Sequence, residues 1–142
     1  MDNIPSELIW IPVKNEYKKR AGSKLTNVEK QFEKDVATHL TSLGYKRFHV
    51  PDIWLGTKLL DEVVFAPDGR IYCIEFKQID WYTFNLSKFE PSQIILLEYM
   101  MRHGNPCYIM VYSQKTGTYW VGTYQYLKDS QNDQGWIKLF TK

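Results

Sequence analysis

Residues 59–77 read LLDEVVFAPDGRIYCIEFK, in which two runs rich in β-branched and aromatic residues flank Pro67-Asp68-Gly69. Proline presets the backbone of the first turn position, and glycine readily takes the positive φ that closes a short hairpin loop. The sequence therefore predicts two antiparallel strands, Leu59–Ala66 and Arg70–Lys77, joined as a hairpin.

The loop length also predicts the register of this hairpin. A three-residue loop pairs Ala66 with Arg70, which places Asp61 opposite Glu75 with Cβ atoms about 5 Å apart. Lys77 projects from the same face because it lies two residues beyond Glu75. Two facing carboxylates in an apolar setting repel each other, and a divalent cation would offset that cost. Oxygen ligands with positions left for water and phosphate suit Mg²⁺.

Two other interpretations of the hairpin stay open. Lys77 could neutralise one acid, so that the three side chains form only a salt-bridged part of the sheet. A slip of one residue would place Glu62 opposite Glu75 instead, because the first strand is apolar enough for either register.

The rest of the chain alternates helical and extended patterns. We interpret the whole as an α/β fold with a mixed β-sheet of about five strands flanked by helices. By length it should be a single domain over 1–142, with a basic N-terminal arm over 1–25, a core over 26–126 and a C-terminal tail over 127–142. The expected elements outside the hairpin are a helix from Thr26 or Asn27 to Gly44, a strand over Lys46–Trp54, a loop over 78–89, a helix over Pro91–His103, and strands over Tyr108–Tyr112 and Tyr119–Tyr124.

Charge and composition narrow the class of protein. A hydrophobic content of 44% indicates a globular chain, and a net charge of +2 does not by itself indicate nucleic acid. Basic residues cluster near the N-terminus, where they form either a solvated arm or a set of phosphate contacts. They are Lys14, Lys18, Lys19, Arg20 and Lys24.

The sequence also indicates a compartment. It contains no apolar run of the roughly 20 residues that a membrane helix needs, and its start lacks the layout of a signal peptide. Cys73 and Cys107 lie in apolar runs, form no CxxC pair and should be buried thiols. Iron–sulfur nucleases, which need four cysteines, are excluded. We expect a cytoplasmic protein of a bacterial or phage-infected cell, without membrane contact.

Asp61, followed after thirteen residues by Glu75-Phe76-Lys77, resembles the D…ExK signature of the PD-(D/E)XK nuclease superfamily. Phe32-Glu33, with Gly44-Tyr45 downstream, resembles the first helix of Holliday-junction resolvases. The stretch from Phe84 through Gln93 to Tyr112 resembles RecU-type resolvases. The likeness spans about residues 29–126 and implies a restriction-endonuclease-like core. RecU-type enzymes carry a stalk insertion for which the connection 52–61 is too short, so junction specificity does not follow.

The resemblance implies a role for each matching residue. Asp61 and Glu75 would bind Mg²⁺, with Mn²⁺ able to substitute, together with the backbone carbonyl of Phe76; Glu33 would bind it directly or through water. Lys77 would orient the attacking water, and Gln93 would hydrogen-bond the water or a phosphate. Glu33 and Gln93 could instead be ordinary helix residues. Asp52, in a literal Pro51-Asp52, is the rival of Asp61.

The function that these features predict is a metal-dependent DNA endonuclease, structure-selective and resolvase-like, acting in recombination or repair. We expect it to act as a homodimer on branched or duplex DNA, without an organic cofactor. Trp81 and Lys88 would join the N-terminal basic residues in binding nucleic acid. The alternatives are a restriction-type or exonucleolytic enzyme of the same superfamily, a non-catalytic nucleic-acid-binding module, and an interaction protein whose carboxylates form only salt bridges.

Overall fold

The computed structural model describes residues 3–18, 28–50 and 60–141. The predicted positions of Lys19, Arg20, Lys24, Asp52 and the helix cap at Thr26 or Asn27 lie outside these ranges. The centre of the fold is a mixed five-stranded sheet in the order β1-β2-β3-β5-β6, in which β3 and β5 are parallel and the other neighbours antiparallel. Its strands are β1 Lys46–His49, β2 Glu62–Phe65, β3 Ile71–Ile79, β5 Cys107–Ser113 and β6 Thr118–Thr123.

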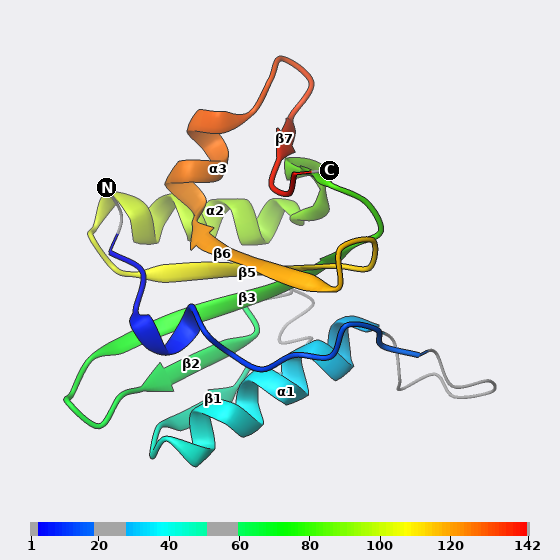
Figure 1. Cartoon of the computed structure of the whole chain (residues 1–142). Coiled ribbons are helices and arrows are strands. Elements are labelled where there is room, and N and C mark those ends of the chain that lie inside the picture. The colour runs from blue at the N-terminus through cyan, green and yellow to red at the C-terminus, as the bar shows by residue number, and fades with distance from the viewer. Residues whose placement is uncertain (1–2, 19–27, 51–59, 142) are drawn as a thin grey trace.

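Helices cover both faces of this sheet, as the α/β prediction requires (Figure 1). Helix α1 and the N-terminal segment pack on one face, and α2, α3 and a two-stranded sheet lie on the other. Side chains alternate across a strand, so Ile74 and Phe76 of β3 join the α1 cluster while Ile79 joins the α2 cluster. The bounds are η1 Ser6–Leu8, α1 Val28–Ser42, β4 Thr83–Asn85, η2 Leu86–Lys88, α2 Pro91–Arg102, α3 Tyr124–Ser130 and β7 Trp136–Lys138.

The predicted hairpin register is confirmed. Phe65 pairs with Ile71 and Val63 with Cys73, and the Ala66 N–H donates to the Arg70 carbonyl at 2.8 Å. Gly69 has the positive φ of 91° that the loop requires. Glu62 pairs with Ile74, so the slipped register that would place Glu62 opposite Glu75 is wrong.

Several predicted boundaries are wrong. β1 ends at His49 and β2 begins at Glu62, so Asp61 immediately precedes its strand; the Val50 N–H still donates to the Asp61 carbonyl at 2.8 Å. β3 continues to Ile79 because parallel pairing with β5 extends to Ser113. The predicted loop 78–89 contains β4 and η2, and the predicted tail contains β7 and most of α3. β4 and β7 pair with each other although more than fifty residues separate them in sequence. Neither segment is long enough to show the alternation of polar and apolar residues that would indicate a strand.

The N-terminal segment packs on the sheet through tyrosine hydroxyls. The Tyr119 hydroxyl donates to the Leu8 carbonyl at 2.6 Å and accepts from the Ile11 N–H at 3.0 Å. The Tyr112 hydroxyl donates to the Lys14 carbonyl at 2.9 Å. Of the basic cluster, Lys14 and Lys18 are described, and both are exposed. In the described ranges, no helix combines the length and apolar character needed to cross a bilayer.

Candidate active site

Asp61 and Glu75 meet where β2 begins, with exposed fractions of 7% and 0%. Each carboxylate accepts a backbone N–H from the other strand. The Asp61 N–H donates to Glu75 Oε1 at 3.2 Å, and the Phe76 N–H donates to Asp61 Oδ2 at 2.8 Å. These reciprocal bonds hold both carboxylates at one end of the hairpin.

Lys77 and Gln93 complete this buried network. Lys77 Nζ lies 3.1 Å from Glu75 Oε2 and donates to Gln93 Oε1 at 3.4 Å. Gln93 Nε2 donates to Glu75 Oε2 at 2.7 Å. Gln93 Oε1 also accepts the Glu90 N–H at 3.0 Å, which forms a capping box at the start of α2. The helix terminus thereby fixes the amide against the carboxylate.

Burial and electrostatic repulsion both disfavour a charged Glu75 at this centre. Burial, and then the charge of Asp61, raise the pKa of Glu75 to about 9, although Lys77 acts in the opposite direction. The single ammonium therefore does not fully compensate two neighbouring carboxylates. Each carboxylate oxygen has two lone pairs, so an oxygen that accepts one hydrogen bond can still contact a cation. The donor set, two carboxylates beside a backbone strand, fits a hard divalent cation.

Glu33 lies in a neighbouring cluster on the α1 face of the sheet. Its Oε1 is 3.2 Å from His49 Nδ1, which is in turn 3.3 Å from Glu62 Oε2. Burial, and then the charge of Asp61, raise the pKa of Glu33 to about 7. Glu33 is thus electrostatically coupled to Asp61 while its shortest contact is with His49. The resemblance to resolvases implied that Glu33 joins Asp61 and Glu75. The structure brings Asp61, Glu75, Lys77 and Gln93 together, with Glu33 beside them.

Two of the predicted nucleic-acid contacts, Trp81 and Lys88, lie at the carboxyl ends of β3 and β5. Ser113 Oγ donates to the Trp81 carbonyl at 2.6 Å, and Lys88 Nζ donates to the Gln78 carbonyl at 3.3 Å. Lys115 Nζ lies 5.1 Å from the centre of the Trp81 ring. A cavity of about 520 Å³ extends from this edge and is lined by Trp81, Lys88 and Trp136 among others.

Sequence reasoning missed His49, Lys115 and Trp136. It considered Glu62 only as an alternative partner of Glu75, and the strand pattern could not show that Glu62 faces His49, because β1 and β2 are joined by a long connection. Trp136 lies in the segment interpreted as a tail. Its pairing with Asn85 brings it to the cavity.

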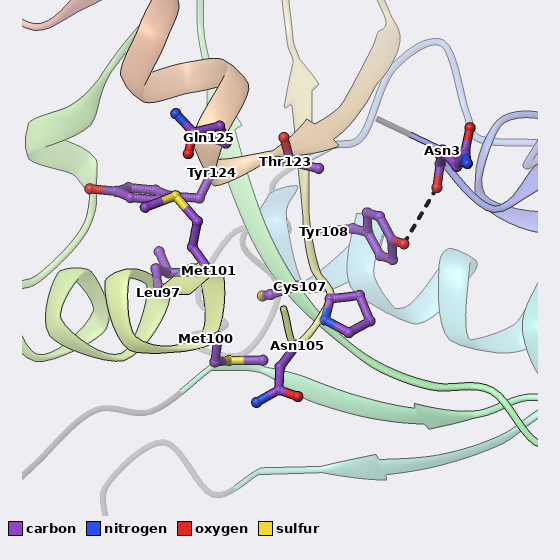
Figure 2. A pocket seen from close by; sticks show the side chains of 11 residues that line it. Asn3, Leu97, Met100, Met101, Asn105, Cys107, Tyr108, Thr123, Tyr124 and Gln125 are labelled. Atoms are coloured by element: carbon purple, nitrogen blue, oxygen red, sulfur yellow. Dashed lines mark hydrogen bonds between the residues drawn. The ribbon is translucent and has the colours of Figure 1, made fainter. Parts of the chain in front are cut away.

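A second cavity, of about 310 Å³, lies at the opposite end of the sheet (Figure 2). Figure 2 shows Met100 and Met101 of α2 on one side and Thr123, Tyr124 and Gln125 on the other. Its lining residues are uncharged, and the Tyr108 hydroxyl there donates to the Asn3 carbonyl at 3.5 Å. Without carboxylates or cations, this cavity has no groups suited to phosphate chemistry.

Comparison with known proteins supports the predicted fold. No protein-family model and no curated protein matches the sequence. Among solved structures, one match is Hjc of Archaeoglobus fulgidus, a Holliday junction resolvase from an archaeal hyperthermophile, with a TM-score of 0.55 and 15% sequence identity. The match covers 75% of this chain and 85% of Hjc. The chain therefore has a mixed-sheet, restriction-endonuclease-like α/β fold similar to that of Hjc.

Proposed function

We propose that this protein is a metal-dependent DNA endonuclease that hydrolyses phosphodiester bonds, with Asp61, Glu75 and Lys77 at its centre. The observation that carries the proposal is the buried contact of two carboxylates with one lysine, on a fold like that of Hjc. A purely structural salt bridge would need one acid, whereas this site buries two.

Asp61, Glu75 and the Phe76 carbonyl would hold Mg²⁺ or Mn²⁺, with Glu33 contributing directly or through water. When bound, the cation would supply Lewis-acid stabilisation of charge on the phosphate. Lys77 has three donors, of which two point at Glu75 and Gln93. The third would orient the attacking water and stabilise the charge that develops on the phosphate. Gln93 would keep Glu75 and Lys77 in place and hydrogen-bond the water or a phosphate oxygen.

The substrate would lie across the carboxyl ends of β3 and β5. Lys14 and Trp81 are both held by backbone contacts to the last residues of β5, and Lys88 and Lys115 lie at the same edge. Exposed indoles with nearby ammonium groups suit unpaired or splayed bases, which have a free face for stacking. We infer selectivity for DNA structure, as in a junction resolvase, acting in recombination or repair in the cytoplasm. Lys18, Lys19, Arg20 and Lys24 would add phosphate contacts.

We propose a homodimer, because symmetrical cutting of two strands needs two sites. The outer face of α2 offers an apolar surface for a second copy, since Ile95 is 70% and Tyr99 53% exposed. The mass in solution, measured by sedimentation for wild type and Ile95→Lys, tests this part separately: a wild-type monomer at all concentrations contradicts it.

The test of the catalytic proposal is cleavage of four-way junction, flap, duplex and single-stranded DNA with Mg²⁺ or Mn²⁺. Glu75→Gln and Asp61→Asn should each lower the rate by at least about 100-fold, since each removes charge from the site. Asp133→Asn, which changes an exposed acid in the segment before β7, should leave the rate unchanged.

Two outcomes would count against the assignment. If wild type and Glu75→Gln behave alike on every substrate, the chain is a non-catalytic binding or interaction protein. If Asp52→Ala abolishes cutting while Asp61→Asn does not, Asp52 is the metal ligand. Digestion from DNA ends alone would favour the exonucleolytic alternative.

A further inference from the structure

Glu33, His49 and Glu62 form a second group of polar side chains, on the α1 face of the sheet. Glu62 and His49 come from paired positions of β2 and β1, and Glu33 comes from α1. One ligand atom from each residue lies within 4.8 Å of the other two. Glu62 follows Asp61 directly but belongs to the opposite face, because successive side chains of a strand alternate.

The geometry of the three side chains is convergent. Glu33 Oε1 and Glu62 Oε2 lie 3.2 Å and 3.3 Å from His49 Nδ1. These separations match the edge of a tetrahedron of nitrogen and oxygen ligands around a zinc-sized ion, which is about 3.3 Å for bonds of 2.0–2.1 Å. Both carboxylate oxygens therefore lie at a ligand-to-ligand distance from His49 Nδ1, and all three ligand atoms lie within 4.8 Å of one another.

The outer oxygens of both carboxylates are occupied by cations. Arg47 Nη1 lies 2.7 Å from Glu62 Oε1, and Lys30 Nζ lies 3.8 Å from Glu33 Oε2. These contacts leave the inner oxygens turned toward His49. Groups that hold the outer atom of a ligand in this way commonly orient it for a metal ion.

A buried oxygen in this group lacks a partner. Glu62 is 2% exposed, and its Oε2 has no hydrogen-bond partner among the described residues, because the 3.3 Å contact with His49 lacks hydrogen-bond geometry. A single Nδ1 proton could satisfy only one of the two inner oxygens in any case. A buried polar atom without a partner is rare and often marks the position of an ion or water.

We propose that Glu33, His49 and Glu62 bind a divalent transition-metal ion, Zn²⁺ or Mn²⁺, at a second site beside the Asp61–Glu75 centre, which Glu33 would then reach only through water. The neutral imidazole, with its proton on Nε2, presents the Nδ1 lone pair to the ion. Two carboxylates balance its charge. The His49 side chain is 42% exposed, so the ion can enter from solvent and keep a water ligand. One nitrogen and two oxygen ligands favour Zn²⁺ or Mn²⁺ over Mg²⁺.

The test separates this site from the proposed catalytic one. In the Asp61→Asn/Glu75→Gln double variant, which lacks both carboxylates of the proposed Mg²⁺ centre and keeps Glu33, calorimetric titration with ZnCl₂ should show one bound equivalent. Adding His49→Ala should lower the affinity about 100-fold. His103→Ala, an exposed histidine after α2, serves as the matched control and should leave the affinity unchanged.

A Co²⁺ titration adds a spectroscopic signature. Visible absorption bands of tetrahedral or five-coordinate Co²⁺ should appear in the double variant and vanish with His49→Ala or with Glu62→Gln, which preserves side-chain volume. Zn²⁺ binding that survives His49→Ala, or no Zn²⁺ binding at all, overturns the proposal. Zn²⁺ binding without DNA cleavage by the wild type would leave this site standing and reject the proposed nuclease.

Discussion

Glu75 is the residue whose position explains most about the candidate site. It is fully buried and contacts a backbone amide, a lysine and a glutamine, yet burial and the charge of Asp61 still raise its pKa to about 9. The folded chain thus holds a proton on this carboxyl more tightly than the unfolded chain does, unless a cation replaces it.

This raised pKa predicts how stability depends on pH. The stability that the protonated Glu75 contributes to the fold is fully present below its ordinary pKa of 4.5 and is lost as the pH rises through about 9. The protonated Glu33 contributes in the same way, and its contribution is lost as the pH rises through about 7. The melting temperature in EDTA should therefore fall between pH 6 and pH 9. Divalent cations should reduce that fall, because they bind the folded state.

Circular-dichroism melts across this range, with and without MgCl₂, provide the measurement. Glu75→Gln should flatten the pH dependence in EDTA, and Glu16→Gln, an exposed glutamate, should not. An unchanged slope in Glu75→Gln would show that another group controls it.

At the scale of single residues, the turn made the register predictable. Pro67-Asp68-Gly69 determined the loop length, and counting from it placed Asp61 opposite Glu75, which the strand pairing confirms. His49 was not predictable in the same way. Its partner Glu62 lies across the connection 50–61, whose length predicts no register.

Among the elements, the N-terminal segment differs most from expectation. Its basic residues indicated either a solvated arm or a set of phosphate contacts, but Leu8, Ile11 and Tyr17 of the same segment are buried against the sheet. Their spacing matches neither helix nor strand, so periodicity could not reveal them. The tyrosines that bind this segment lie about a hundred residues later, and no local pattern links such distant partners.

Tyr119→Phe tests this attachment. The variant removes a hydroxyl that bonds both the Leu8 carbonyl and the Ile11 N–H, which should lower the free energy of unfolding by about 1–3 kcal/mol. Tyr126→Phe, which changes a half-exposed tyrosine of α3, should stay within about 0.5 kcal/mol. Urea denaturation of both variants gives the comparison. Equal stabilities would mean that the segment contributes little to the fold.

Over the whole molecule, the alternation of helices and strands was enough to predict a mixed sheet covered on both faces. The segments that close the second face, β4 and β7, were missed because each is three residues long. Strands so short have no measurable alternation, and only their mutual pairing stabilises them. That pairing also brings Trp136 to the cavity beside Trp81.

The two tryptophans predict how the molecule holds DNA. Trp81→Ala and Trp136→Ala should each weaken binding of single-stranded or branched DNA by about 1–3 kcal/mol if a base stacks on each indole. Perfect duplex should be affected less, because its bases are already stacked. Fluorescence anisotropy in the Glu75→Gln background measures binding without cleavage. Trp10→Ala removes an indole that is 84% exposed and lines a different part of the surface, and should change nothing.

The hairpin also limits which insertions and deletions the protein can accept. Asp61 and Glu75 share a face because residues that stand opposite each other in paired strands project to the same side of the sheet. The turn between them only joins the two strands. A residue deleted at Val63 would move Asp61 to the opposite face, whereas a glycine added beside Asp68 would lengthen a solvent-exposed loop. We expect the deletion to eliminate metal-dependent cleavage and the insertion to preserve it. Length variation in natural relatives should accordingly occur at the turn and not within either strand.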